Sequence, residues 1–472
     1  MSKADPSRHR RRAHRQSPRA VVACLAFTAT ACVAYEPAPL RPVEVLAAAD
    51  LARERAPDIA PNAEGTLEAL VERLETADPE LRRVRARLAI ADAVAAHRTP
   101  LANPTLTAGP LWLAGGGIDG SDQLGLEAAL GLLVPLGSVR SATDALHSAQ
   151  AQLAHVEAIA AYRDAYLALR RDALTLAAAA TALATTADLA TLAEQNLLQT
   201  RRLADAGVAS ATDVRLSALE AARASAATLA AREREFDART ALARRLGLAT
   251  HRIDASLTVP SPDLPDVVPD PATLRGALLR ERGDLAVLRL RHTVAEARLA
   301  LEIERQWPSI AIGPSYERES DQHRYGLGIG IELPLFDRNQ QAIARARAER
   351  DAARVDYETA MTDALHDVET ARTRVALRAA RVAAITNELV PAANAAATAL
   401  EAAVAAGAAD GLALLEAARA QRTARLDEVL AAADLAAAYA DLEAATGAPL
   451  LRFRGEPART LTPLPSPKES SR

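Results

Sequence analysis

Residues 124–134 read LGLEAALGLLV, a stretch in which apolar residues recur at every second position. A period of two is the side-chain period of a β-strand. Residues 326–333, GLGIGIEL, show the same period with glycine, and once Glu332, between the apolar residues. Both stretches predict strands with one apolar face and one small or polar face. The apolar positions are Leu124, Leu126, Ala128, Leu130, Leu132 and Val134 in the first, and Leu327, Ile329, Ile331 and Leu333 in the second.

A further strand is expected before each of these, at 105–112 and at 310–317, with polar loops at 114–122 and 318–324. Runs of about ten alternating residues match a tilted strand that crosses a bilayer. Four strands cannot close into a barrel, and an open edge in lipid leaves backbone groups unpaired. Membrane strands therefore require several copies of the chain, eight strands from two copies or twelve from three. A soluble antiparallel sheet with one wet face is the alternative.

The chain is an internal repeat. Asn103-Pro104 matches Trp307-Pro308 at an offset of 204, and Gly207 and Gly247 match Gly407 and Gly447 at an offset of 200. Each half then contains a helix, two strands, a long helix, a glycine-marked reversal and a return helix. The predicted organisation is a signal peptide at 1–31, an N-terminal segment at 32–65, repeat 1 at 66–258, a Pro-rich linker at 259–272, repeat 2 at 273–454 and a disordered tail at 455–472.

The expected helices dominate the fold. The region 138–206 lacks proline, and at ~1.5 Å per residue it predicts a rod on the order of 100 Å. A kink or register change is expected at Pro391. The fold class is mainly α with a small membrane β part. The predicted ranges are helix 66–98, strands about 104–135, and helices 138–206 and 212–245 in repeat 1; in repeat 2 they are helix 273–305, strands about 308–335, and helices 340–406 and 412–445.

Composition excludes several function classes. Lysine occurs only at Lys3 and Lys468, so the body of the chain has neither a nucleotide-binding lysine nor a Schiff-base lysine. The two cysteines, Cys24 and Cys32, lie near the N-terminus and cannot form a disulfide framework in the main chain. The sequence also lacks hydrolase, metalloprotease and phosphate-loop motifs. We therefore expect neither an enzyme nor a cofactor.

The first 31 residues resemble an export signal. Seven basic residues precede a short apolar stretch at 20–31, which is too short to span a bilayer. The string Ala29-Thr30-Ala31-Cys32 resembles a lipobox and predicts lipidation at Cys32. Ala29 replaces the usual leucine, so ordinary signal peptidase cleavage is the alternative. Removing these residues, which carry seven basic side chains and one acidic side chain, changes the formal charge from −4 to −10 and argues against nucleic-acid binding.

Several strings in the correct order resemble the TolC-type outer-membrane efflux factor family. They are Asp78-Pro79-Glu80-Leu81, the reversal GVASATDV at 207–214, and IELPLFDRNQ at 331–340, which resembles the heavy-metal (CzcC/CusC-like) branch. The resemblance implies a homotrimer with a twelve-stranded outer-membrane barrel and a long periplasmic α-helical barrel. It also implies passive export from a periplasmic adaptor and an inner-membrane transporter of the RND type, with heavy-metal cations among the possible cargoes.

The resemblance also suggests site residues. Adaptor docking is expected at the helical reversals, and acidic side chains next to them are candidates for a tunnel constriction that attracts cations. Asp213 and Glu416 are those candidates, although Ala413 stands where a second acidic residue would be expected. The alternative for Asp213 is a helix N-cap or a first-turn charge. The docking candidates are Gly207, Val208, Ala209, Gly407 and Ala408.

No metal ligands are assigned, because the histidines of the main chain are scattered. His366 and Glu369 are three residues apart on an expected helix, but a solvated pair of charges explains them as well. A different class of function also fits the sequence. A coiled-coil scaffold of the cell envelope, tethered by lipid at Cys32, would need no pore and would contain soluble strands.

Overall fold

The computed structural model describes residues 35–54, 66–113, 123–253, 263–265, 267–319, 322–406, 408 and 411–452. The chain separates into two compact units, residues 1–52 and 53–472. Helix α2 (Pro42–Glu54), which begins in the first unit, buries none of its residues. The predicted signal peptide, Cys32 and the predicted tail lie outside the described residues.

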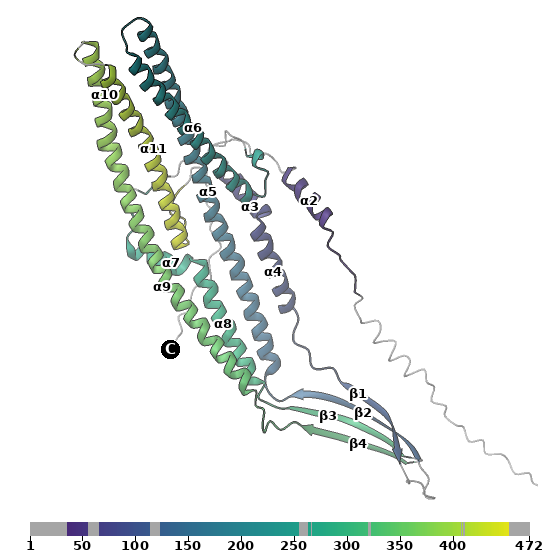
Figure 1. Ribbon diagram of the computed structural model, residues 1–472. Coiled ribbons are helices and arrows are strands. Elements are labelled where there is room, and N and C mark those ends of the chain that lie inside the picture. Colours follow the sequence, from purple (N-terminus) through teal and green to yellow (C-terminus); the bar gives the residue numbers. More distant parts are fainter. Residues whose placement is uncertain are drawn as a thin grey trace, which may run out of the picture. The chain divides into compact units, whose positions relative to one another are not determined.

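The second unit contains the same series of elements twice (Figure 1). In both halves, helices precede a pair of strands and a long helical hairpin follows it. The first series is α3 (Thr66–Ala77), α4 (Pro79–Ala95), β1 (Thr105–Leu113), β2 (Gln123–Pro135), α5 (Val139–Asp205) and α6 (Ala211–Arg245). After a 3₁₀ turn (Thr250–Arg252), the second series is α7 (Pro271–Glu281), α8 (Gly283–Glu304), β3 (Ser309–Glu319), β4 (Gln322–Ile331), α9 (Gln340–Ala384), α10 (Val390–Ala405) and α11 (Gly411–Thr446).

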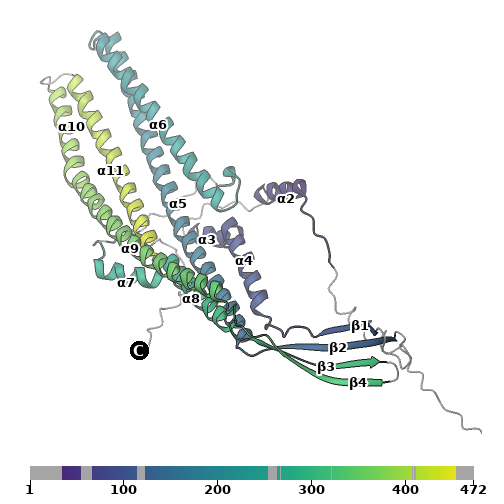
Figure 2. The ribbon, with the colours of Figure 1, turned by 60° about the horizontal axis from the view of Figure 1, so that its bottom comes forward.

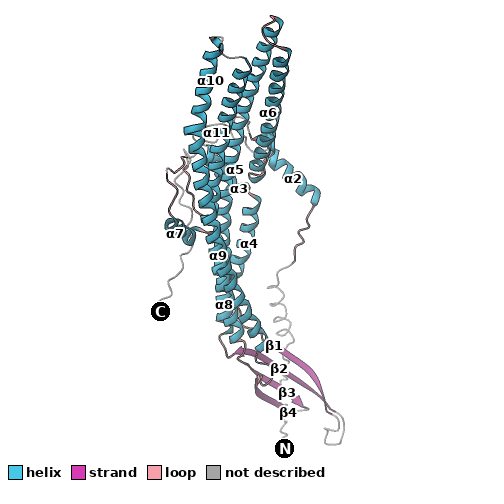
Figure 3. Cartoon of the chain, turned by 60° about the vertical axis from the view of Figure 1, so that its left-hand side comes forward, coloured by secondary structure: helices cyan, strands magenta, loops and turns pink. Residues whose placement is uncertain are grey.

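The four strands form one antiparallel sheet in the order β1-β2-β3-β4. The central pair, β2 and β3, joins the two repeats. Within residues 53–472, the sheet lies at one end of the helices and the two hairpin reversals lie at the other (Figures 2 and 3). The structure is thus mainly helical with a small sheet, as the sequence predicts.

The single helices predicted at 66–98 and 273–305 are each two helices. Asp78 interrupts the first, with an extended backbone (ψ 122°), because the following Pro79 disfavours the helical conformation at the residue before it. The Asp78 carboxylate then caps α4 by accepting from the backbone N–H groups of Glu80 (2.8 Å) and Leu81 (2.9 Å). The second break is at Arg282, whose backbone is also extended.

The charged loop predicted at 318–324 is mostly strand. β3 continues to Glu319 and β4 begins at Gln322, so the charged side chains lie on paired strands. Cross-strand pairs of opposite charge and of aromatic rings stabilise such positions, which explains why polarity misled the prediction. The other predicted loop, at 114–122, lies outside the described residues.

The long helix of repeat 2 changes register just before Pro391. A π-helix at Ile385–Leu389 separates α9 from α10, whereas α5 of repeat 1 continues unbroken from Val139 to Asp205. A π-helical turn leaves room for a residue that cannot donate a backbone hydrogen bond. This is the register change expected at Pro391.

Helix α5 is the centre of the packing and contacts α4, α6, α8 and α11. Its central section contributes to the main core, where Leu169 belongs to the same buried cluster as Leu242 and Leu442 from the two return helices. Many other core positions are alanine. Small side chains let these helices approach closely, which suits a chain in which aromatic residues make up only 3%.

Candidate functional site

The sheet separates its side chains into two distinct faces. Cross-strand pairs such as Leu106↔Leu130 and Ile312↔Ile329 place apolar residues from all four strands on one side, here called the apolar face. Because the strands pair in register, the face is continuous. It contains Leu106, Ala108, Pro110, Trp112, Leu124, Leu126, Ala128, Leu130, Leu132, Val134, Ile310, Ile312, Pro314, Tyr316, Arg318, His323, Tyr325, Leu327, Ile329 and Ile331.

No element of the described chain covers β4 on this face. All residues of β4 are exposed, with Leu327 at 67% and Ile329 at 69%. Isolated exposed leucines are normal on soluble proteins, but a continuous apolar surface of this extent marks a contact with a membrane or another protein.

The opposite face, here called the small-residue face, is formed largely by Gly, Thr, Ser and Ala. It also contains Leu111 and Leu133, and three carboxylates and one arginine lie on it. Glu127 lies opposite Glu317, and Arg324 pairs with Glu317 (3.7 Å) and Glu319 (2.9 Å). Polar and small side chains of this kind suit a surface in contact with water.

Exposed aromatic side chains lie near both ends of the strands. The exposed Trp112 and Tyr325 lie toward the end farther from the helices, where the half-buried Tyr316 has its ring 5.4 Å from that of Tyr325. At the helical end, Trp307 precedes β3 and Phe336, which is 93% exposed, follows β4. Aromatic residues favour the two boundaries of a bilayer because they combine an apolar ring with a polar or polarisable edge.

The two outer strands leave hydrogen-bonding groups available. β1 pairs only with β2 and β4 pairs only with β3, so one edge of each has no partner strand within the described chain. Such edges recruit another strand, and in lipid they would be costly if left open.

The first hairpin reversal is built around Gly207, which has a left-handed backbone (φ +78°). The N–H of Val208 donates to the carbonyl of Leu203 (2.8 Å), which closes the end of α5. Val208 is 74% exposed at the turn, and Ala209 follows it before α6 begins. The tip therefore presents a small apolar surface on a turn that a backbone hydrogen bond closes.

Asp213 belongs to the cap of α6. Ser210 Oγ accepts from the N–H of Asp213 (3.2 Å), while the Asp213 carboxylate accepts from the N–H and the hydroxyl of Ser210, both at 2.8 Å. These bonds form a reciprocal capping box. They hold the pKa of the Asp213 carboxyl below its usual value. The sequence left two roles open for Asp213, a tunnel constriction and a helix N-cap. The hydrogen bonds show the N-cap.

The second reversal repeats the first where it is described. The N–H of Ala408 donates to the carbonyl of Ala403 (2.8 Å), the counterpart of the bond from Val208 to Leu203 at an offset of 200. Gly407 lies outside the described residues. Glu416 is exposed on α11, and Ala413 precedes it by one turn.

A polar contact that no sequence pattern predicts joins the two hairpins between the tips and the core. Glu220 on α6 binds Arg223 of its own helix (2.8 Å) and approaches Arg419 on α11 (3.7 Å). Burial lowers the pKa of neighbouring Arg422, and the charge of Glu220 opposes that shift. The return helices are thus linked by charge where they otherwise make few contacts.

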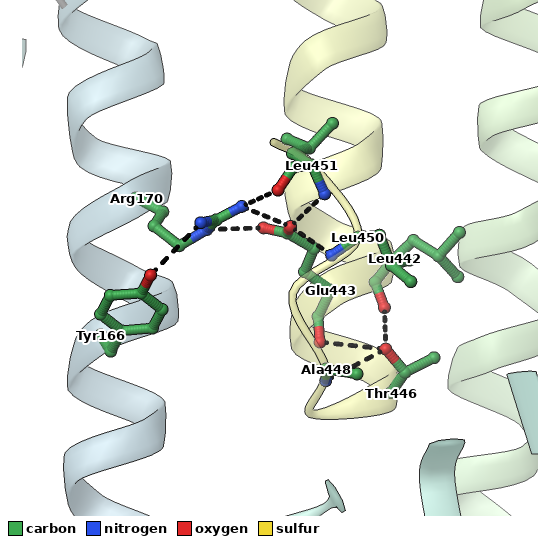
Figure 4. A network of polar contacts seen from close by, with 8 residues as sticks. All are labelled: Tyr166, Arg170, Leu442, Glu443, Thr446, Ala448, Leu450 and Leu451. Atoms are coloured by element: carbon green, nitrogen blue, oxygen red, sulfur yellow. Dashed lines mark hydrogen bonds and ion pairs between the residues drawn. The ribbon is translucent and has the colours of Figure 1, made fainter. Parts of the chain in front are cut away.

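A buried ion pair links the repeats at the level of the core (Figure 4). Arg170 Nη2 on α5 lies 2.9 Å from Glu443 Oε1 on α11, and the same nitrogen donates to the carbonyl of Leu451 (2.6 Å). Glu443 Oε1 also accepts from the N–H groups of Leu450 (2.6 Å) and Leu451 (2.7 Å). Burial raises the pKa of Glu443, and Arg170 together with the backbone donors opposes the rise.

Among the described residues, no group of three or more His, Cys, Asp or Glu side chains is arranged to hold a metal ion. His366 and Asp367 lie on α9, where Asp367 pairs with Arg282 (3.2 Å). The candidate sites of the described chain are therefore the two faces of the sheet and the hairpin tips, and many of the charged side chains described above form ion pairs.

Comparison with known proteins matches this architecture to solved structures. The outer-membrane channel OprN shares 20% identity with the chain over 83% of it and 94% of OprN, with a TM-score of 0.68. The fold is that of outer-membrane efflux channels. VceC, an outer membrane protein of Vibrio cholerae, aligns with 82% of the chain and 99% of its own at 18% identity and a TM-score of 0.66.

The sequence of repeat 2 agrees with this efflux-channel fold. Residues 274–448 match the family described as outer membrane efflux protein. CusC, solved in a study of its folding and transmembrane channel formation, aligns with 83% of the chain and 94% of its own at 16% identity and a TM-score of 0.64. No curated protein matches the sequence.

Proposed function

We propose that three copies of the chain form a passive outer-membrane channel of a TolC-type efflux system. Four strands from each copy would close a twelve-stranded barrel, and the helices would continue it as a periplasmic tunnel. The observation that carries the proposal is the exposed apolar face on a sheet with two open edges. Closure between copies satisfies both edges, and lipid covers the apolar face.

The helical part offers a second reason for assembly. Among the described helices, α5 has an 18-residue window that is apolar enough to cross a membrane, with a mean hydropathy of 1.4. Only 28% of that window is buried within one chain. In a trimer, neighbouring copies would cover the part of this window that one chain leaves exposed. The apolar character of α5 is therefore explained by packing in a helical barrel as well as by a membrane span.

The hairpin tips are the proposed docking sites for a periplasmic adaptor, which would link the channel to an inner-membrane pump of the RND type. The exposed Val208 and the half-buried Ala209 form an apolar tip with a closed backbone, and Ala408 lies at the place in repeat 2 equivalent to Val208. Energy for transport would come from the pump, and the channel itself would act without catalysis.

Heavy-metal cations are a proposed cargo class, and Glu416 is the proposed constriction residue. Its exposed carboxylate near the tip of α11 would occur three times around a threefold axis. A ring of carboxylates raises the local concentration of cations. Asp213 would contribute to the shape of the tip through its cap.

The rival proposal is the pore-free scaffold tethered at Cys32, and one experiment separates the two. Purified full-length protein should cross-link as a trimer in detergent and should give discrete conductance steps in a planar bilayer. A scaffold would be released by lipoprotein cleavage without detergent and would leave the bilayer electrically silent. A folded monomer without conductance would overturn the channel proposal.

A further inference from the structure

The apolar face ends in two basic side chains beside the β3–β4 turn. Continuing the strand alternation past Tyr316 and Tyr325 brings Arg318 and His323 onto this face, where they are a cross-strand pair. Leu126 lies opposite Arg318 on β2. Both basic residues are exposed, about 7 Å beyond the tyrosines at ~3.4 Å per residue.

The two faces of this hairpin carry different charges. Glu317 and Glu319 lie on the small-residue face, where both pair with Arg324. Glu127 lies on that face as well. Within strand residues 105–113, 123–135, 309–319 and 322–331, no carboxylate belongs to the apolar face. The basic pair therefore lies at the end of an apolar surface, on the side away from the strand carboxylates.

His323 is held in a defined position by Tyr316. Tyr316 Oη lies 2.8 Å from His323 Nδ1, and the two rings stack with their centres 5.9 Å apart. When the hydroxyl donates to Nδ1, the proton of the neutral imidazole is on Nε2. Nε2 is then a second donor beside the Arg318 guanidinium, and protonation would add a charge without removing that donor.

We infer that Arg318 and His323 bind the phosphorylated headgroup of an outer-leaflet lipid. The inference rests on the proposed function, which places the β3–β4 turn at the outer surface because the helices lie at the opposite end of the strands. A lipid fits better than a soluble anion, because its acyl chains would lie along Leu126, Leu327 and the rest of the apolar face. The guanidinium matches a phosphate in charge and in donor geometry.

The test is lipid binding to the full-length, delipidated assembly in detergent, measured by native mass spectrometry. The probes are phosphatidic acid and phosphatidylcholine with identical acyl chains. The unaltered protein should prefer phosphatidic acid by about tenfold, which is the scale of one charge-assisted hydrogen bond. Arg318→Gln should remove most of this preference, and His323→Phe, which keeps a stacked ring, should reduce it.

Arg324→Gln is the matched control, because Arg324 is in the same hairpin but on the small-residue face. It should keep the preference for phosphatidic acid. If it lost that preference as fully as Arg318→Gln, the inference would be wrong. Inorganic phosphate should not compete at the same concentration, and full competition would indicate an anion site without a lipid requirement, which also overturns the inference.

A second measurement does not depend on how the variants fold. The preference of the unaltered protein should fall as salt is raised, because an exposed charge contact is screened. A preference that is unchanged by salt would contradict the role of Arg318. Conductance in a planar bilayer is recorded on the same preparation, so a functional channel without lipid preference would reject this inference alone and leave the proposed function intact.

Discussion

Arg170 and Glu443 form an ion pair with side-chain exposures of 0% and 1%, and it joins α5 of repeat 1 to the end of α11 in repeat 2. The carboxylate also binds the backbone of Leu450 and Leu451, so the pair fixes the chain that follows α11. A buried charge is tolerated only with compensating partners, and here both charges have several.

Arg170→Gln should lower the apparent free energy of unfolding by about 3–5 kcal/mol, because it leaves the buried Glu443 carboxylate without a cation. Chemical denaturation of the solubilised protein measures the effect. Arg171 provides a control on the same pair of helices, since it binds Asp441 (3.1 Å) but is 56% exposed. Arg171→Gln should cost less than about 1 kcal/mol, and equal losses from the two variants would contradict the role assigned to burial.

Two glycines with the same backbone conformation should respond differently to alanine. Gly447 (φ +74°) and Gly207 (φ +78°) both end a helix in the left-handed region. A Cβ on Gly447 would lie 2.6 Å from the carbonyl oxygen of Glu281, whereas one on Gly207 meets nothing within 4 Å. Gly207→Ala should cost only the conformational penalty of about 1–2 kcal/mol.

Gly447→Ala should therefore be clearly more destabilising than Gly207→Ala in the same denaturation experiment, because the added methyl group also pushes against the backbone between α7 and α8. Similar midpoints for the two variants would show that the contact at Glu281 relaxes freely. Far-ultraviolet circular dichroism of both variants checks that their helical content is unchanged.

The sequence could predict the elements that follow a simple period or repeat. The alternation at 124–134 and 326–333 identified strands β2 and β4 with their faces, although β4 ends at Ile331, before the predicted Leu333. The glycines 200 apart identified the helix ends that the structure displays at Gly207, Gly247 and Gly447. These signals are local. The alternation depends on the side-chain period of a single strand, and the glycine depends on the backbone conformation at the end of a single helix.

The sequence alone could not predict contacts between segments that are far apart along the chain. Arg170 and Glu443 are separated by 273 residues, and nothing near either residue indicates its partner. An arginine within the apolar part of a long helix was the available clue that a buried partner existed. Asp213 differs, because Ser210 three residues earlier already forms the sequence pattern of a cap, and only the geometry could show that the cap is made.

Glu416→Gln should reduce cation selectivity, because each copy would lose one carboxylate from the proposed constriction. Reversal potentials in asymmetric salt across a planar bilayer measure the effect. Glu233→Gln removes another exposed carboxylate, from α6 and farther along the return helix, and should leave selectivity unchanged. Unaltered reversal potentials in Glu416→Gln would exclude Glu416 from the constriction.

Cys32→Ser should abolish metabolic labelling by fatty acid if the lipobox prediction is correct, because the thiol is the acceptor of the lipid. Cys24→Ser changes the other cysteine, which lies within the segment predicted to be removed, and should leave labelling intact. Persistent labelling of Cys32→Ser would contradict the predicted anchor and favour cleavage by ordinary signal peptidase.

The assignment of the two sheet faces can be tested with neighbouring residues on one strand. The double substitution Ile329→Asp and Ile331→Asp places charges on the apolar face, whereas Gly328→Asp and Gly330→Asp place the same charges on the small-residue face. A Cβ on either glycine is at least 3.7 Å from its nearest neighbour, so the control substitutions begin in available space. Charge facing lipid costs up to about 2–4 kcal/mol per residue near the bilayer centre, with Asp toward the lower end.

The isoleucine variant should therefore fail to assemble in the outer membrane, while the glycine variant should assemble and alter conductance, because its charges would face the proposed lumen. Membrane fractionation with trimer cross-linking measures assembly, and bilayer recording measures conductance. Normal assembly of the isoleucine variant would show that the apolar face is not in lipid. The reverse pattern, in which only the glycine variant fails, would mean that the two faces are exchanged.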